Sequence, residues 1–186
     1  DGTFTEDIKN WTSHLCLSAM GVDIADINND GLSDIFITDM MPEGDARIKS
    51  VMEFEGYNVF KLKQSKDFYQ QYIQNTLQLN MGNNSFSEIA NYSGVAKTDW
   101  SWAGLLFDMD NDGNKDLYIA NGIYKDLTDQ DYLQYIANES VIESIVTAEG
   151  VNYKELIDII PSNKVPNHAY KNTGDLVFSE YTNSGL

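Results

Sequence analysis

Short apolar runs separated by polar turns dominate the hydrophobic pattern of this chain. Some of these runs alternate apolar and polar positions and lead into a glycine turn that is followed by an aromatic residue. Others directly precede or follow a stretch rich in Asp, Asn and Gly. Such runs at close spacing predict β-strands joined as hairpins. The predicted strand segments are 19–22, 35–37, 76–80, 102–107, 117–119 and 168–172.

Residues 123–166 have a helical pattern instead. Thr128 and Asp131 resemble a capping box, and Gly150 is a suitable residue for the helix to stop at. A second short helix is predicted over 152–160. The apolar residues predicted to face inward are Leu133, Ile136, Ala137, Val141, Ile145, Leu156, Ile159 and Ile160.

Residues 41–74 form a less regular segment. Apolar residues at 48–52 and at 68–73 favour helical pieces there. Both this segment and the later helical one interrupt the strand pattern. We therefore interpret them as two insertions between strands.

The chain contains an internal repeat. Residues 26–34 return as 108–116, an offset of 82 residues (108 − 26), and 75–88 return as 167–180, an offset of 92 (167 − 75). The second copy therefore holds ten more residues between its acidic stretch and the next turn. The predicted units are about 1–82 and 83–174, with insertions at about 41–74 and 123–166 and the start of a further unit at 175–186.

The phase of the repeat bears on architecture. Both ends of the chain fall inside a unit, and stacked repeats generally need three or more units, or four to eight blades in a propeller. We therefore expect residues 1–186 to be a fragment of one longer array. The predicted fold class is all-β with helical insertions, as a partial β-propeller.

Each copy of the repeat contains an acidic loop, the first loop at 26–34 and the second loop at 108–116. Side chains at positions 1, 3 and 5 of a tight loop, a carbonyl at position 7 and a carboxylate at position 9 offer the oxygen ligands that hard cations prefer. Position 12, where an EF-hand has a bidentate Glu, is Ile37 or Ile119, so an EF-hand is excluded. The candidate ligands are Asp26, Asn28, Asp30, Leu32 and Asp34, and Asp108, Asp110, Asp112, Asn114 and Asp116.

A polar turn between strands is the simpler alternative for each loop. A turn does not need several carboxylates crowded together, and without a cation these would repel one another. We therefore expect two Ca²⁺ sites, with Mg²⁺ or Mn²⁺ well behind. The second loop offers four carboxylates and the first offers three with one amide, so the count predicts tighter binding at the second loop.

At these residues the chain resembles the FG-GAP or VCBS repeat, the unit of integrin-α-like β-propellers. The matching features are Asp-x-[Asp/Asn]-x-Asp-Gly-x-x-Asp, the apolar strand after it, and a later Asn-x-Gly-x-x-x-Phe. Segments 74–90, 98–122 and 162–180 are similar to VCBS-repeat proteins of Bacteroidetes related to cartilage acidic protein. The resemblance implies a propeller with calcium in its blade loops, in an exported and often surface-attached protein.

The charge of the chain narrows the classes of partner. It has 29 acidic and 12 basic residues, a formal charge of −17, which excludes nucleic acid and anionic membrane surfaces as favourable partners. No run of about 20 apolar residues is present, so no membrane span is expected. The single cysteine, Cys16, lies in an apolar stretch and is expected in the core rather than as a nucleophile.

No enzyme motif is found in the sequence. His14 and His168 lie far apart in different contexts, and no nucleophile elbow, phosphate loop or zinc-protease motif is present. The prediction is therefore a non-catalytic, calcium-binding scaffold for adhesion at the cell surface or outside the cell, with a protein or carbohydrate ligand and the remaining blades as partners.

Two alternatives remain open. One is a carbohydrate-binding module, in which Trp100, Trp102 or Tyr92 stacks on a sugar ring. The other is the propeller portion of a polysaccharide-degrading, lyase-like enzyme. Such an enzyme needs a basic cluster, and near the second loop the sequence offers Lys97, Lys115 and Lys125.

Overall fold

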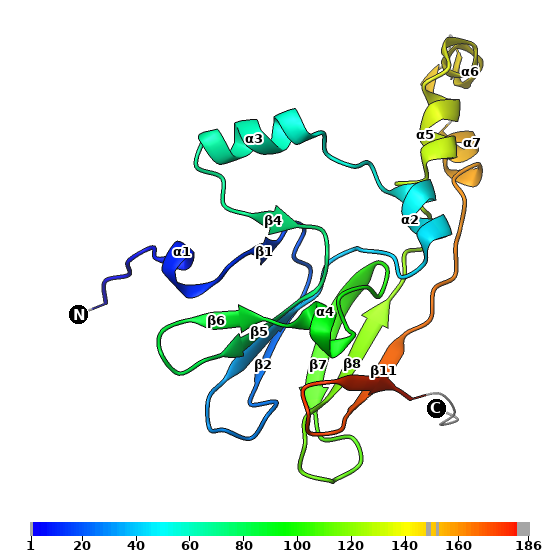
Figure 1. Cartoon of the computed structure of the whole chain (residues 1–186). Coiled ribbons are helices and arrows are strands. Elements are labelled where there is room, and N and C mark those ends of the chain that lie inside the picture. The colour runs from blue at the N-terminus through cyan, green and yellow to red at the C-terminus, as the bar shows by residue number, and fades with distance from the viewer. Residues whose placement is uncertain (1, 148–149, 152, 182–186) are drawn as a thin grey trace.

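Two four-stranded antiparallel sheets form the body of the molecule in the computed structural model (Figure 1), which describes residues 2–147, 150–151 and 153–181. In both sheets the spatial order of the strands follows the chain, so each sheet is a meander. The first sheet contains β2 (Val22–Ala25), β3 (Asp34–Ile37), β5 (Thr76–Asn80) and β6 (Phe86–Glu88). The second contains β7 (Ser101–Phe107), β8 (Asp116–Asn121), β11 (His168–Asn172) and β12 (Phe178–Glu180).

The strands of the two sheets keep the offsets of the sequence repeat. β3 and β8 begin 82 residues apart (116 − 34), and β5 and β11 begin 92 residues apart (168 − 76). Predicted strands at 76–80 and 168–172 coincide with β5 and β11. The body is therefore antiparallel sheet with helices in the connections, as expected. Among the described residues the two sheets do not close into a barrel or a propeller.

Sheets and repeat units are out of phase. β6 belongs to the stretch that begins the second unit, yet it pairs with β5 of the first sheet. At the start of the chain, Phe4 is the repeat equivalent of Phe86 but lies outside any strand and is fully exposed. The first helix, α1 (Ile8–Trp11), follows it.

The core lies between the two sheets, where β2 runs beside β7. Gly104 is required there, because a Cβ on it would lie 2.4 Å from the ring of Phe36. The Leu106 amide donates a hydrogen bond of 2.8 Å to the carboxylate of Asp23 across the same contact. The buried core residues are Ile27, Phe36, Leu77, Leu79, Ala90, Val95, Ala96, Leu106, Leu117, Ile119, Tyr170 and Phe178.

The first insertion forms two helices, α2 (Asp45–Val51) and α3 (Tyr57–Ser65). The helical piece predicted near 48–52 corresponds to α2. The piece predicted at 68–73 is wrong, because this segment instead contains β4 (Gln71–Tyr72), which pairs in parallel with β1 (Leu15–Cys16). Backbone N–H and C=O groups of this segment bond to β1, whereas in a helix they would bond within the segment.

The second insertion contains α5 (Gln130–Ile136), α6 (Glu139–Ile145), the short hairpin of β9 (Val146–Thr147) with β10 (Gly150–Val151), and α7 (Tyr153–Asp158). A last short helix, α4 (Ala90–Ser93), follows β6.

Several details of the predicted helices in this insertion are wrong. Leu133, predicted to face inward, is 39% exposed. The N-cap of α5 is Asp129 rather than Thr128, because the Asp129 side chain accepts a hydrogen bond from the Tyr132 amide. The single helix predicted to run to Gly150 breaks at Asn138, whose side-chain oxygen accepts from the Ser140 amide, the competition with backbone bonding that favours Asn at helix starts.

Two predictions concern the end of this insertion. Ile160 is buried as expected, whereas Ile159 is 37% exposed and does not face inward. Residue 152, where the second helix was predicted to begin, lies outside the described residues. No helix in the described part of the chain is long and apolar enough to cross a membrane.

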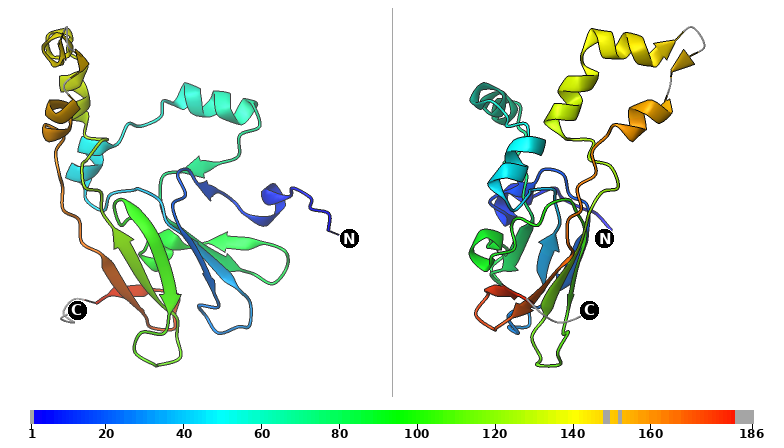
Figure 2. Two further views of the ribbon diagram at one scale, coloured as in Figure 1. Left: turned by 180° about the vertical axis from the view of Figure 1, so that it is seen from behind. Right: turned by 90° about the vertical axis from the view of Figure 1, so that its right-hand side faces the viewer.

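The insertions and the acidic loops lie at opposite ends of the sheets. In Figures 1 and 2 the helices of both insertions rise at one end, and the turns β2–β3 and β7–β8 point the other way. Arg47 on α2 joins the insertions, since its guanidinium pairs with Asp99 at 2.9 Å and with Asp126. The body therefore separates the helical insertions from the acidic loops.

Candidate metal centre

The two acidic loops are folded by the same hydrogen bonds. In each, the carboxylate at position 1 accepts from the backbone amides of positions 5 and 6, at 3.1 and 2.8 Å for Asp26 and at 3.1 and 3.0 Å for Asp108. The glycine at position 6 has the expected positive φ, 86° at Gly31 and 92° at Gly113. The backbone therefore curls around the first carboxylate, which the sequence spacing predicts.

The carboxylates at position 9 anchor each loop to its sheet. Asp34 and Asp116 are fully buried, and each accepts one backbone amide from position 2 of its own loop, both at 2.9 Å. Their other oxygens accept the amides of Asn80 at 2.8 Å and Asn172 at 2.9 Å. Burial raises the pKa of Asp34, and the two backbone hydrogen bonds partly offset this.

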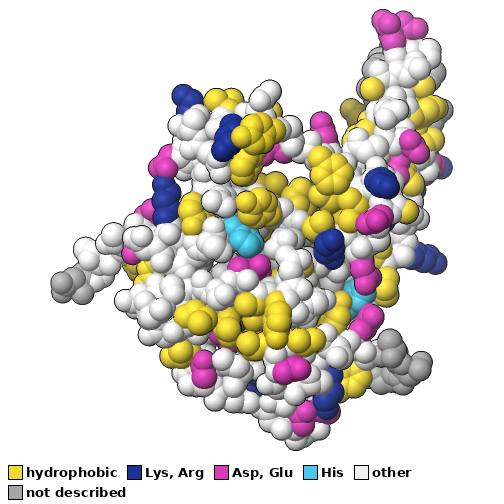
Figure 3. All heavy atoms as spheres, in the orientation of Figure 1, with side chains coloured by type: hydrophobic (Ala, Val, Ile, Leu, Met, Phe, Trp, Pro, Cys, Tyr) yellow, Lys and Arg dark blue, Asp and Glu magenta, His cyan; other side chains and the backbone are white. Residues whose placement is uncertain are grey.

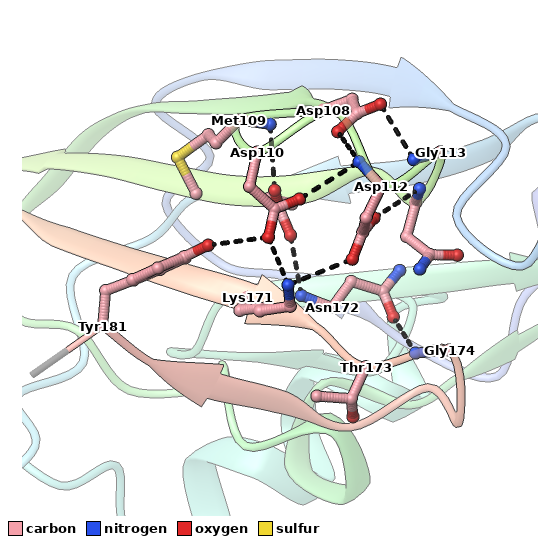
Figure 4. Close-up of polar contacts among 12 residues, drawn as sticks. Asp108, Met109, Asp110, Asp112, Gly113, Lys171, Asn172, Thr173, Gly174 and Tyr181 are labelled. Atoms are coloured by element: carbon pink, nitrogen blue, oxygen red, sulfur yellow. Dashed lines mark hydrogen bonds and ion pairs between the residues drawn. The ribbon is translucent and has the colours of Figure 1, made fainter.

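The middle positions differ between the loops. In the first loop the Asn28 amide donates to Asp30 at 2.9 Å. In the second loop both residues are carboxylates, and the ammonium of Lys171 lies between them, paired with Asp110 and 3.1 Å from Asp112 (Figure 4). The second loop thus already holds a cationic group of the protein itself.

Tyr181 is a second partner of the same carboxylate. Its hydroxyl donates to Asp110 at 3.2 Å, from the residue that follows β12. The hydrogen bond from Lys171 is the main reason that the pKa of Asp110 is lowered, and the same bond raises the pKa of Lys171. The carboxylate of Asp110 is therefore ionised at neutral pH.

The second loop fits a hard cation. Carboxylate oxygens of Asp108, Asp110 and Asp116 all lie within 4.8 Å of one another. Two oxygens on opposite sides of one Ca²⁺ are separated by about 5 Å, twice the usual bond length, so these three can share an ion. Asp112 does not belong to this group.

The described residues 26–34 of the first loop contain no such carboxylate triad. The reason is the amide at Asn28, which leaves only Asp26 and Asp34 as carboxylates at the three equivalent positions. The predicted position-7 residues are held by their amides, since Leu32 donates to Asp30 at 2.8 Å and Asn114 donates to Asp112 at 2.9 Å.

The two loops also touch each other. The Asn29 side chain donates to the Asn114 side-chain oxygen at 3.2 Å. The Asn172 side chain donates to the Ile27 carbonyl of the first loop at 2.8 Å and to the Lys115 carbonyl of the second at 3.1 Å. A structural change in one loop can therefore be transmitted to the other through these hydrogen bonds.

Lys171, Tyr181 and Asn172 contact the acidic loops, and the sequence analysis did not predict these contacts. Asn172 and Asn80 match each other in the repeat, which was a signal for a shared role at the loops. Lys171 replaces the apolar Leu79 of the first copy. That charged residue at an otherwise apolar repeat position was a signal that it has an ionic partner.

The remaining candidates have ordinary surroundings. Cys16 is 7% exposed, which confirms a core residue, and burial raises the pKa of its thiol. His168 pairs with Glu180 at 2.8 Å, and His14 pairs with Glu88 at 3.4 Å. Each histidine therefore has a glutamate partner in the fourth strand of a sheet.

The structure brings two of the three candidate sugar-stacking residues together. The rings of Trp100 and Trp102 have centroids 6.3 Å apart at 34°, and the Trp102 indole donates to the Gly122 carbonyl at 2.6 Å. Tyr92 lies on α4 and is 66% exposed.

A cavity of about 900 Å³ lies at the insertion end of the molecule, between α3 and the β1–β4 pair. Figure 3 shows hydrophobic side chains gathered on this face. Glu53, Glu55 and Lys63 are among its polar residues, and Glu55 and Lys63 pair with each other. The aromatic lining residues are Phe54, Tyr57, Phe60, Phe68, Tyr69 and Tyr72.

The comparisons with known proteins give no match, so a proposed function rests on the geometry of the chain. No family model matches the chain. No curated protein and no solved structure matches it either. The acidic loops, built twice with the same hydrogen bonds, are the strongest functional feature of the described residues.

Proposed function

We propose that this chain is a segment of an FG-GAP/VCBS-type β-propeller that binds Ca²⁺ at its acidic loops and acts as a non-catalytic scaffold for binding at the cell surface or outside the cell. One observation carries the proposal. The loops at 26–34 and 108–116 are folded by equivalent hydrogen bonds to their first and ninth carboxylates. Asp side chains in polar turns also accept hydrogen bonds from nearby amides, but a turn does not need three carboxylates within 4.8 Å of one another, as Asp108, Asp110 and Asp116 are.

The chemistry of the donors favours calcium. The ligands on offer are carboxylate, amide and carbonyl oxygens, with no thiolate and no imidazole in either loop. Hard cations with six to eight oxygen ligands suit such a loop, and a flexible shell suits Ca²⁺ better than Mg²⁺. The ion would be held by Asp108, Asp110 and Asp116 in the second loop and would neutralise their mutual repulsion.

The packing of the sheets supports a longer stack. Leu106 is buried against the first sheet, whereas its repeat equivalent Ile24 is 58% exposed on the far face of that sheet. Phe107 is 44% exposed on the far face of the second sheet, whereas its equivalent Ala25 packs against the core. Ile24 of the first sheet and Phe107 of the second are thus exposed where their repeat equivalents are covered, and further sheets of the same kind would fit head to tail on both sides.

The first test is thermal unfolding of chelator-treated protein with and without Ca²⁺. A ligand that binds only the native state at a hundred times its Kd stabilises it by about 2.7 kcal/mol. We expect Ca²⁺ to raise the Tm of the unaltered chain. The increase should be smaller in Asp108→Ala/Asp110→Ala and should persist in Glu53→Gln/Glu139→Gln, which removes two exposed carboxylates outside the loops. An identical Tm with and without Ca²⁺ would refute the proposal.

Carbohydrate binding is a second candidate function, favoured by the aromatic cavity. Aromatic rings stack on the apolar faces of sugar rings, and the acidic surface disfavours anionic polysaccharides. We would titrate the chain with neutral oligosaccharides and compare it with Tyr57→Ala/Phe68→Ala. Saturable binding that the double variant loses would support this candidate, and equal binding by both would contradict it.

The lyase-like alternative is tested by turnover. Lys125 donates to the carbonyls of Asp158 and Ile160, so its ammonium has structural partners in the second insertion. Cleavage of acidic polysaccharides by the chain would overturn the non-catalytic part of the proposal. We expect no cleavage above the rate without protein.

A further inference from the structure

The two acidic loops differ in one residue that lies outside both of them. Lys171 on β11 places its ammonium at Asp110 and 3.1 Å from Asp112. The equivalent position of the first sheet (171 − 92 = 79) is Leu79, which is buried and carries no charge. The repeat has therefore put a cation beside one loop only.

The second loop loses its charge advantage when its lysines are counted. It has four carboxylates and Lys115, a net charge of −3, and Lys171 brings the net charge to −2. The first loop has three carboxylates and the neutral Asn28, a net charge of −3. The electrostatic advantage that the count of carboxylates gives to the second loop is thus more than cancelled.

Ligand access differs as well. A metal ion in the second loop needs oxygens of Asp110, which already accepts hydrogen bonds from Lys171 and Tyr181. Either the ammonium stays and repels the incoming ion, or it moves into solvent and gives up two ionic contacts. The Lys171 side chain is 36% exposed, so the second course is sterically open. In the first loop, Asp30 instead accepts a hydrogen bond from the neutral side-chain amide of Asn28.

We infer that Lys171 is an internal counter-ion that competes with Ca²⁺ for the second loop, so that the first loop is the tighter site. This rests on the proposed function, because it concerns the same two loops. It reverses the order that the count of carboxylates alone predicts. The second loop would then fill only at higher Ca²⁺ concentration, after the first.

Calorimetric Ca²⁺ titration of the whole chain in two backgrounds tests the inference. Asp26→Asn/Asp30→Asn disables the first loop and isolates the second, and Asp108→Asn/Asp112→Asn does the reverse. Lys171→Leu installs the residue of the first copy. Lys97→Leu makes the same change of charge at an exposed lysine outside both loops.

With the first loop disabled, we expect Lys171→Leu to lower the Kd for Ca²⁺ at least about tenfold and Lys97→Leu to change it less than about twofold. With the second loop disabled, neither substitution should matter. Equal effects of the two lysines, or none, would overturn the inference while leaving the calcium sites standing. Absence of Ca²⁺ binding in every variant would instead refute the proposed function, and the inference with it.

A second substitution guards against loss of the fold. Lys171→Gln removes the charge and keeps a polar side chain beside the second loop. It should reproduce most of the gain of Lys171→Leu, with an unfolding transition as cooperative as that of the parent. A gain with Leu but none with Gln would contradict a counter-ion role, because the charge is absent in both.

Discussion

The sheets with their loops are repeated between the two copies, whereas the helical insertions are not. The sheets are built twice, with matching strands, matching loop hydrogen bonds and one shared core. The insertions share no element between the copies, since one holds α2 and α3 and the other α5 to α7. The repeat thus fixes the end that carries the acidic loops and leaves the opposite end free to vary, as binding surfaces on rigid scaffolds commonly do.

The sheets should tolerate change least. Phe36 is fully buried and fills the space that Gly104 leaves open. We expect Phe36→Ala to lower the free energy of unfolding by about 3–5 kcal/mol, as for large-to-small changes in cores. The control is Phe68→Ala in the first insertion, where the ring is 58% exposed, with an expected loss below about 1 kcal/mol. Urea unfolding measures both, and equal losses would remove the distinction between the two regions.

Replacing Arg47 tests whether its ion pairs with Asp99 and Asp126 hold the insertions in place. Its loss leaves Asp99 and Asp126 buried without a charge partner, which costs about 3–5 kcal/mol at fully buried sites. Because the Arg47 side chain is 18% exposed, we expect about 2–4 kcal/mol for Arg47→Ala. Lys49→Ala, at an exposed position of the same helix, should stay within about 0.5 kcal/mol. An Arg47→Ala protein as stable as this control would show that the ion pairs are not what joins the insertions.

The loss of stability caused by Arg47→Ala should also depend on pH, and this dependence should be the smallest of the expected effects. Burial alone would raise the pKa of Asp126, but hydrogen bonds from Arg47 and Asn163 outweigh it, so the pKa is lowered in the fold. A lowered pKa contributes stability above the unfolded value near 4, and this is lost as the pH falls through the folded value. The stability gap between the parent and Arg47→Ala should therefore narrow below about pH 4.

Comparing the parent with Arg47→Ala isolates the contribution of Asp126 to the pH dependence of stability. Burial also raises the pKa of Asp34 and of Asp39, which acts in the opposite direction, but both carboxylates are present in the parent and in the variant. Urea unfolding at several pH values from 7 down to 3 gives the gap. A constant gap over this range would show that Arg47 does not act through Asp126.

Most strands of the two sheets could be predicted because their pattern occurs twice in the sequence, whereas the strand predicted at 19–22 is wrong, since β2 spans Val22–Ala25. Two matching copies of 26–34 with apolar runs after them left little choice of register, and β5 and β11 have the predicted bounds. The insertions have no second copy. There, local competition decided the outcome, as at Asn138, where a side-chain hydrogen bond interrupts an apolar face that would otherwise continue.

The loops could be predicted for a similar reason, whereas their partners could not. Ligand spacing within nine residues is a local property, so the positive φ at Gly31 and Gly113 followed from the motif. Lys171 meets Asp110 across 61 positions of the chain. No periodicity reports a contact at that separation, and only the arrangement of β11 beside β8 places the two together.

The contact between Asn172 and the Ile27 carbonyl has a consequence for the order of folding. It joins residues 145 positions apart, whereas each sheet pairs only strands that are consecutive within it. Closing so long a stretch costs chain entropy that a single hydrogen bond does not return. The contact is therefore favourable only once both meanders exist, which makes the joining of the two loops a late event on the way to the native state.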